Sequence, residues 1–288
     1  NEYYVDKTHY LPLLDSAGRF LFLIRPRRFG KSLLQSVMEC YYDAHWARQF
    51  EELFADTWIA AHPTPEKGRY VTLRFDFSMI NASFPGGLPH SFDAHIRIRI
   101  EECLKRHADH IPADEATAIL AESNSYQRLQ RLFIVLAERQ LPLYLFIDEY
   151  DNFANNRLVT KGEAAYRELT HGGGFFKGFF ALLKGAAGGT SGGLARLFIT
   201  SVSPLTMDDV TSGFNIGTNI SLDPEFNGML GFNHAEMDTL FRAFDQDFST
   251  HRAIIDDWYN HYHFHKARME PIVNSDMALY YLQSLHRL

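Results

Sequence analysis

Cysteine, long apolar runs and surplus positive charge are all scarce in this chain of 288 residues. The two cysteines, Cys40 and Cys103, lie in helix-like segments without metal-ligand spacing, which predicts free core thiols in a reducing compartment. No apolar run reaches the roughly 18 residues of a membrane span, and the first residues do not resemble a signal peptide. The 28 basic and 35 acidic residues give a net charge of −7, which argues against a surface that coats nucleic acid. We therefore expect a soluble cytoplasmic protein that does not contact a membrane.

Apolar and aromatic residues are plentiful. They make up 46% and 14% of the chain, enough for a substantial core. The length suits one large α/β domain with a smaller region appended to it.

A phosphate-binding loop is the first motif. The apolar run 20–24 predicts a buried strand, Gly30-Lys31-Ser32 follows in a turn, and residues 33–42 have apolar positions at helical spacing. Loop amides and the positive end of a helix dipole can bind phosphate oxygens in such a turn. Lys31 would supply charge for the β- and γ-phosphates, and Ser32 a hydroxyl ligand for Mg²⁺.

This loop departs from the common pattern G-x-x-x-x-G-K-[ST], because Arg25 stands where the first glycine belongs. By itself the segment therefore also fits a basic surface turn before a helix. Arg27 and Arg28 could replace the missing contacts or stabilise charge on the γ-phosphate. They could equally pair with surface carboxylates.

An acidic pair at the end of a second strand makes the phosphate-loop interpretation much stronger. Residues 143–147 predict a buried strand that ends in Asp148 and Glu149. Asp148 could hold Mg²⁺ together with Ser32, while Glu149 could orient and deprotonate an attacking water. A strand that merely ends in a solvated acidic turn is the simpler alternative.

Two further strands are predicted, at 70–77 and 194–201. Asp76, near the end of the first, could face a ligand or cap a turn. Thr200, Ser201 and Ser203 are candidates to contact the γ-phosphate or the lytic water from the second. Residues 188–193 have the composition of a flexible linker.

Helices are predicted at 10–17, 49–62, 91–110, 125–139, 163–169 and 175–185, and over most of 206–288, where one begins at Asn233. His261, His263 and His265 alternate as in a short strand. They could bind a metal, but no carboxylate or cysteine joins them at ligand spacing.

Several ordered blocks resemble the bacterial AAA-ATPase-like family over nearly the whole chain. They are residues 4–8, 25–34, 146–151, 203–204, 211–216 and 221–224. The resemblance implies that Arg25 is a family trait, that Lys31 and Ser32 are the Walker A lysine and hydroxyl, and that Asp148 and Glu149 are the Walker B pair. Similar sequences tend to have glycine at the position of Ser201. The family commonly carries a C-terminal nuclease-like domain, and any nucleic-acid contact would come only from such a domain outside this chain.

The fold expected is a three-layer α/β P-loop NTPase, with a mostly parallel sheet and helices on both faces. Residues 1–205 would form the AAA-like ATPase core, and residues 206–288 a smaller, mainly helical lid or connector. One additional strand should lie between the phosphate-loop strand and the acidic strand.

The function expected is Mg²⁺-dependent binding and hydrolysis of ATP, coupled to a partner, another copy of the chain or a C-terminal effector domain. Lys31, Glu149, Thr200 and Ser201 are the predicted catalytic residues, and Ser32 and Asp148 the predicted metal ligands. Nucleotide-binding residues are predicted at Arg27, Arg28, Phe29, Gly30, Lys31, Ser32 and Leu33. A nucleotide-gated switch with negligible turnover remains the alternative. A small-molecule or nucleoside kinase is also open, although the acidic pair at one strand end weighs against it.

Overall fold

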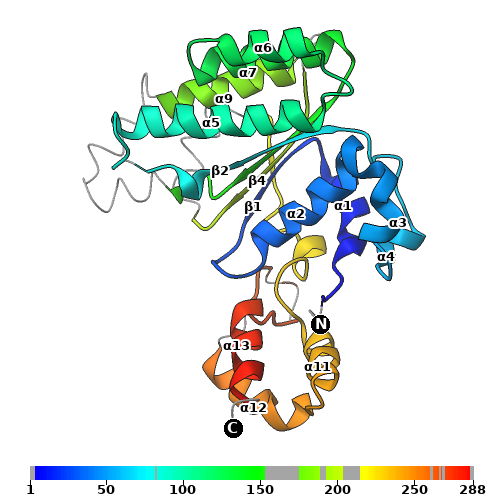
Figure 1. Ribbon diagram of the computed structural model, residues 1–288. Coiled ribbons are helices and arrows are strands. Elements are labelled where there is room, and N and C mark those ends of the chain that lie inside the picture. The colour runs from blue at the N-terminus through cyan, green and yellow to red at the C-terminus, as the bar shows by residue number, and fades with distance from the viewer. Residues whose placement is uncertain are drawn as a thin grey trace.

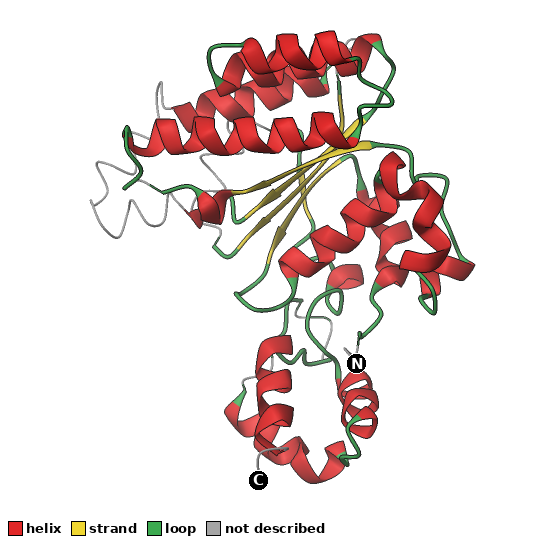
Figure 2. Ribbon diagram, viewed as in Figure 1, coloured by secondary structure: helices red, strands yellow, loops and turns green. Residues whose placement is uncertain are grey.

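A parallel β-sheet organises the fold (Figures 1 and 2). The structure is a computed structural model and describes residues 4–81, 83–152, 175–188, 193–203, 215–259, 262–265, 267 and 270–285. In this part of the chain the strand order is β2-β3-β4-β1-β5 and every pairing is parallel. The strands are β1 (Phe20–Ile24), β2 (Val71–Asp76), β3 (Leu143–Asp148), β4 (Leu194–Ser201) and β5 (Thr218–Asn219). Because β4 lies between β1 and β3, the expected additional strand is confirmed.

Alternating side chains give the sheet two apolar faces. Phe20 and Phe22 of β1 point into one core, whereas Leu21 and Leu23 point into the other. The first core is covered by α5 (Gly87–Arg106), α6 (Ala113–Ala121), α7 (Ser125–Glu138) and α9 (Phe175–Ala187). The second is covered by α1 (Leu11–Ala17), α2 (Lys31–Tyr42), α3 (Phe50–Leu53) and α4 (Trp58–Ala61). Figure 1 shows these helix groups on opposite sides of the sheet, so the predicted three-layer α/β fold is confirmed.

A third apolar cluster lies in the C-terminal lobe, which we define as residues 233–285. Its helices are α11 (His234–Ala243), α12 (Phe248–Trp258) and α13 (Ser275–Leu285), and they lie below the sheet domain in Figure 1. Asn233 forms a capping box with Glu236 at the start of α11, as its sequence predicts. The boundary expected after residue 205 stays a prediction, although β5 adds residues 218–219 to the sheet.

Short 3₁₀ segments complete the described elements: η1 (Thr8–Tyr10), η2 (Ala44–Gln49), η3 (Phe77–Met79) and η5 (Pro224–Phe226). No described helix combines the length and the hydropathy needed to cross a bilayer. Cys40 and Cys103 are both free thiols, as expected.

Three predictions about local structure are wrong. The helix expected at 49–62 is divided into the end of η2, α3 and α4, because Asp56 adopts φ +62° and interrupts the helical path. The helix expected at 91–110 ends at Arg106, and a separate helix, α6, follows it. In place of the expected histidine strand, the described residues 262–265 form a single bridge, between Tyr262 and Ile272. The helix expected at 163–169 lies outside the described residues.

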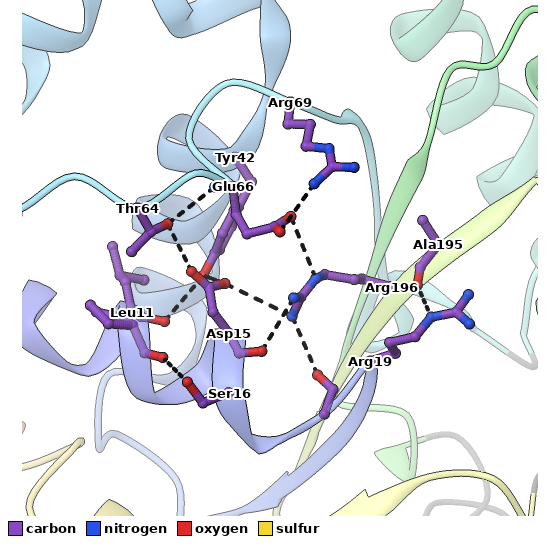
Figure 3. A network of polar contacts seen from close by, with 12 residues as sticks. Leu11, Asp15, Ser16, Arg19, Tyr42, Thr64, Glu66, Arg69, Ala195 and Arg196 are labelled. Carbon is purple, nitrogen blue, oxygen red and sulfur yellow. Dashed lines mark hydrogen bonds and ion pairs between the residues drawn. The ribbon is translucent and has the colours of Figure 1, made fainter.

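A polar network links the amino ends of the strands, away from the loop at 25–30 (Figure 3). Arg196 at the start of β4 donates to the carbonyls of Asp15 and Gly18, and to the hydroxyl of Tyr70 at 3.0 Å. Its guanidinium also faces the carboxylates of Asp15 and Glu66 at 3.8 and 4.0 Å. The network therefore ties α1, β4 and the segment before β2 to one cation.

Candidate functional site

The loop between β1 and α2 lies at the carboxyl end of the sheet, where open α/β sheets bind ligands. Arg28 at φ +67° and Gly30 at φ +92° turn the chain sharply into α2. A glycine tolerates this conformation, whereas an arginine is strained there. The first-turn amides of α2 have no carbonyl within their own helix to bond, so they are available to an anion.

Lys31 is held inside the loop. Its Nζ donates to the carbonyls of Arg25 and Pro26, both at 2.9 Å, and the side chain is buried. Burial lowers the pKa of Lys31, while Asp148, Glu149 and Asp151 act in the opposite direction. The ammonium group is therefore held by the loop carbonyls, and the carboxylates of the strand end stabilise its charged form.

Asp148 is the centre of the site and is 1% exposed. Its Oδ2 accepts a hydrogen bond of 2.5 Å from Ser32 Oγ and faces Arg74 Nη2 at 3.4 Å. Its Oδ1 accepts from the Thr200 hydroxyl and from the Glu149 amide. A hydroxyl and a carboxylate in contact are oxygen donors of the kind Mg²⁺ prefers, so these side chains fit the metal that was predicted.

Glu149 stands at the edge of the site with its backbone at φ +49°. No donor among the described residues bonds to its carboxylate. Burial and the neighbouring Asp148 raise the pKa of Glu149, whereas Lys31 and Arg27 act to lower it. A half-buried carboxylate with a raised pKa is suited to accept a proton from water.

Sequence reasoning missed two residues of the site. Arg74 on β2 contacts Asp148, donates to Ser36 Oγ at 2.7 Å and donates to the Ser32 carbonyl at 3.2 Å. Gln35 is fully buried, and its amide donates to Thr200 Oγ1 and to the carbonyl of Ile147. Two signals were available in the sequence. Arg74 is a charge two residues before the end of a predicted strand, and Gln35 is a polar residue four positions after Lys31.

The other predicted residues lie around this centre in different ways. Thr200 is fully buried behind Asp148, and the equally buried Ser201 hydroxyl donates to the Ser203 carbonyl. The Phe29 ring is buried and packs edge-on against Tyr262 and Phe264.

The two loop arginines differ in their surroundings. Arg27 is exposed and close enough to influence Glu149. Arg28 pairs with Asp276 of α13 at 2.8 Å.

A cleft of about 350 Å³ adjoins the loop. It is lined by Arg28, Gly30 and Leu33 from the loop and α2, together with residues from the N-terminal segment and the C-terminal lobe. Apolar side chains dominate the walls, including Tyr4, Leu230 and Leu279. A flat apolar ligand attached to a phosphate group could therefore occupy both the cleft and the loop.

No histidine metal site is found within the described residues. His263 and His265 lie in this part of the chain, whereas His261 lies outside it.

Comparison with known proteins identifies the family of this chain. A family model described as "Predicted AAA-ATPase" matches residues 1–211. The chain belongs to that family. The matched residues include both the loop at 25–32 and the strand end at 148–149.

Two individual proteins are similar to this predicted AAA-ATPase. The "Uncharacterized protein in vnfD 5'region" of Azotobacter chroococcum mcd 1 is 26% identical over 277 residues, which cover 91% of this chain and 45% of that protein. The chain thus spans less than half of that relative. The crystal structure of Cdc6p from Pyrobaculum aerophilum is 13% identical, with a TM-score of 0.40, and the match covers 83% of this chain and 49% of Cdc6p.

Proposed function

We propose that this chain binds ATP together with Mg²⁺ and hydrolyses it. The hydrogen bond from Ser32 to Asp148 is the observation that carries the proposal, and the carboxylates of Asp148 and Glu149 act to raise the pKa of the neighbouring Lys31. A lysine, a hydroxyl and two carboxylates come together at the end of the sheet, although the sequence places them in two distant segments. This is the set of groups that phosphoryl transfer to water requires.

Each residue has a defined part in the proposed reaction. Lys31 and the first-turn amides of α2 hold the phosphates, and Ser32 and Asp148 would hold Mg²⁺, which supplies positive charge against the phosphate oxygens when bound. Glu149 accepts a proton from the water that attacks the γ-phosphorus, and the bond from the γ-phosphorus to the bridging oxygen of ADP breaks. Arg27 is exposed and acts to lower the pKa of Glu149, and its proposed part is to stabilise charge on the γ-phosphate.

The nucleobase would occupy the apolar cleft beside the loop. Leu33, Tyr4 and Leu230 offer apolar and aromatic surface for a planar ring. Arg28 and Gly30 line the same cleft, so a base there and phosphates in the loop belong to one continuous ligand.

Thr200 is proposed to act through Asp148 and not by touching phosphate, because its hydroxyl is buried against that carboxylate. A direct catalytic role for Ser201 stays a prediction.

The test compares wild type with Lys31→Ala and Glu149→Gln, with Lys105→Ala as a control. Lys105 is exposed and forms an ion pair with its helical neighbour Glu101. Phosphate release is measured with Mg²⁺ and without any acceptor substrate, and ATP binding is measured in parallel. Wild type and Lys105→Ala should turn over ATP, Lys31→Ala should bind it more weakly, and Glu149→Gln should bind it and turn it over slowly. Mg²⁺-dependent turnover that is absent in wild type, or unchanged in both site variants, rejects the hydrolase.

A nucleotide-gated switch is the second candidate, favoured by direct contacts between the loop and the C-terminal lobe. Asn274 donates to the carbonyl of Arg27 at 3.1 Å, and the amide of Asp276 donates to that of Arg28 at 3.4 Å. Bound ATP that stays intact for hours would identify the switch. Phosphate transfer that requires an added acceptor would instead identify a kinase.

Coupling to a partner, to a second copy of the chain or to a C-terminal nuclease-like domain is proposed for the longer proteins that this chain resembles. The proposed site of action is the cytoplasm.

A further inference from the structure

Arg25 stands where other phosphate loops have a glycine, and its side chain is almost fully buried at 1% exposure. The guanidinium donates three hydrogen bonds to backbone carbonyls. Nη1 bonds to Ser221 at 2.6 Å and to Ile24 at 2.9 Å, and Nη2 bonds to Phe226 at 2.9 Å. Ser221 and Phe226 belong to the segment after β5, about two hundred positions further along the chain.

A ring from a third segment covers the same guanidinium. Arg25 Cζ lies 3.8 Å from the centroid of the Phe264 ring, a cation–π contact with a planar group that suits stacking. Phe264 also packs against Phe29 at the other end of the loop. The loop and the chain at 221–226 and 264 thus meet at a single side chain.

Packing alone does not explain a charge at this place. No carboxylate among the described residues lies within ion-pair distance of Arg25. Burial lowers the pKa of Arg25 to about 10, so the group remains a cation at neutral pH. A methionine of similar length would fill the space without the cost of burying a charge.

The backbone of Arg25 touches the nucleotide site directly. Its carbonyl accepts one of the two hydrogen bonds from Lys31 Nζ, and its amide donates to the carbonyl of Ser201 at 3.1 Å. If Lys31 moves toward phosphate oxygens, its hydrogen bonds to the carbonyls of Arg25 and Pro26 are the first contacts to change.

We propose that Arg25 is a positioning residue that sets the shape of the phosphate loop in place of the usual glycine and couples nucleotide binding to residues 221–226 and 264. The guanidinium holds these segments against the loop by hydrogen bonds and by the Phe264 ring. The inference rests on the proposed binding of ATP.

The test uses Arg25→Met, which keeps the volume, Arg25→Gly, which restores the common motif, and Arg25→Lys, which keeps the charge. Arg19→Met is the matched control, because Arg19 also bonds backbone carbonyls and lies over the ring of Phe20, but at the opposite end of β1. Two quantities are measured on the full chain: the Kd for ATP with Mg²⁺, and amide-exchange protection of residues 219–230 and 262–272 with and without saturating nucleotide.

In wild type and Arg19→Met, nucleotide should increase the protection of both segments. Arg25→Met and Arg25→Gly should bind ATP about 10–100-fold more weakly, as displaced site groups do. At saturation they should also lose the nucleotide-dependent gain in protection, which a purely structural role would leave in place. Arg25→Lys should recover part of the affinity, because lysine donates to carbonyls but does not stack as a plane.

Phe264→Leu provides an independent variant that leaves the loop sequence intact. It should reduce the gain in protection at 262–272 even if the methionine variant does not fold. Wild-type affinity and wild-type protection in Arg25→Met and Arg25→Gly would overturn the coupling while leaving ATP binding intact. A wild-type chain that binds no ATP would overturn the proposed function itself, and the inference with it.

Discussion

Ser32 Oγ donates a hydrogen bond of 2.5 Å to Oδ2 of Asp148, although 116 positions of sequence separate the two residues. Two structural facts produce this contact. Ser32 lies in the first turn of α2, and Asp148 is the last residue of β3. Because parallel strands all end at one edge of the sheet, the start of the helix after β1 meets the end of β3. We expect this meeting point to govern turnover, its pH dependence and its response to Mg²⁺, whereas two ion pairs elsewhere in the fold should contribute to stability.

Glu149→Gln should lower ATP turnover by about 10²–10⁴-fold while leaving nucleotide affinity near that of wild type. The substitution removes the proton acceptor but keeps the size of the side chain. Steady-state phosphate release and equilibrium binding provide the two measurements. Glu138→Gln, at the exposed end of α7, is the control that should change neither.

The same carboxylate should set the acidic limit of activity. Glu149 acts as a base only when ionised, and its pKa is raised above the ordinary 4.5 by burial first and by Asp148 second. Turnover should therefore fall as the pH is lowered through that raised pKa, above the range of an ordinary glutamate. Arg27→Gln should move the limit to still higher pH, because Arg27 lowers this pKa, whereas Arg28→Gln should not. An acidic limit that is the same in all three proteins would contradict this role.

Thr200→Val should weaken the response to Mg²⁺. Valine has nearly the same shape but no hydroxyl, so Asp148 loses a donor and Gln35 loses an acceptor. We expect the Mg²⁺ concentration for half-maximal turnover to rise by about 10-fold, the lower end of the range for groups that orient metal ligands. Thr117→Val, in an exposed position of α6, should leave the Mg²⁺ titration unchanged. A Thr200→Val titration that overlays the wild-type curve would rule out positioning through Asp148.

Arg196→Met should destabilise the fold by about 3–5 kcal/mol, because it leaves Asp15 and Glu66 without their shared cation (Figure 3). Arg69→Met is the comparison, since Arg69 also pairs with Glu66 but is 59% exposed. An exposed pair contributes about 0–1 kcal/mol. Urea unfolding of wild type and both variants measures the free energy of unfolding. Equal losses of stability from the two substitutions would show that burial of the Arg196 ion pairs does not matter.

Lys7 and Glu236 should be energetically coupled. Lys7 Nζ bonds the Glu236 carboxylate at 2.5 Å and the carbonyl of Gly228 at 2.8 Å, with side-chain exposures of 11% and 19% for the ion pair. A double-mutant cycle with Lys7→Met and Glu236→Gln should give an interaction of about 1–3 kcal/mol. Glutamine can still complete the capping box with Asn233, so the cycle isolates the ion pair.

The exposed helical pair Glu101 and Lys105 provides a second cycle for comparison. It should give about 0.3–0.5 kcal/mol. A Lys7–Glu236 interaction no larger than this value would show that the N-terminal segment is not fastened to the C-terminal lobe by charge.

The sequence predicted the sheet strands well because their signal is local. Each of β1 to β4 contains a short apolar or alternating run of residues, which is a pattern that neighbouring positions alone reveal. The prediction of one helix at 49–62 was wrong because apolar spacing does not show where a helix is interrupted. Its apolar spacing is satisfied by η2, α3 and α4 packing separately, and the reversal at Asp56 depends on a backbone angle that periodicity does not encode.

Side chains whose roles depend on distant partners were the hardest to predict. Arg74 and Gln35 contribute through Asp148 and Thr200, which lie more than 70 positions away in the chain. The place of Arg25 in the loop was visible as a missing glycine, but its contacts with Ser221, Phe226 and Phe264 follow only from the folded chain.

The hydrogen bonds from Lys31 to the carbonyls of Arg25 and Pro26 change how one common experiment should be interpreted. This lysine is an internal brace of the loop, and in the proposed function it also supplies charge for the phosphates. Substituting it removes both at once, so a phenotype of Lys31→Ala in cells reports a relaxed loop together with lost affinity. Glu149→Gln leaves that brace intact and is the better tool for separating occupancy from turnover.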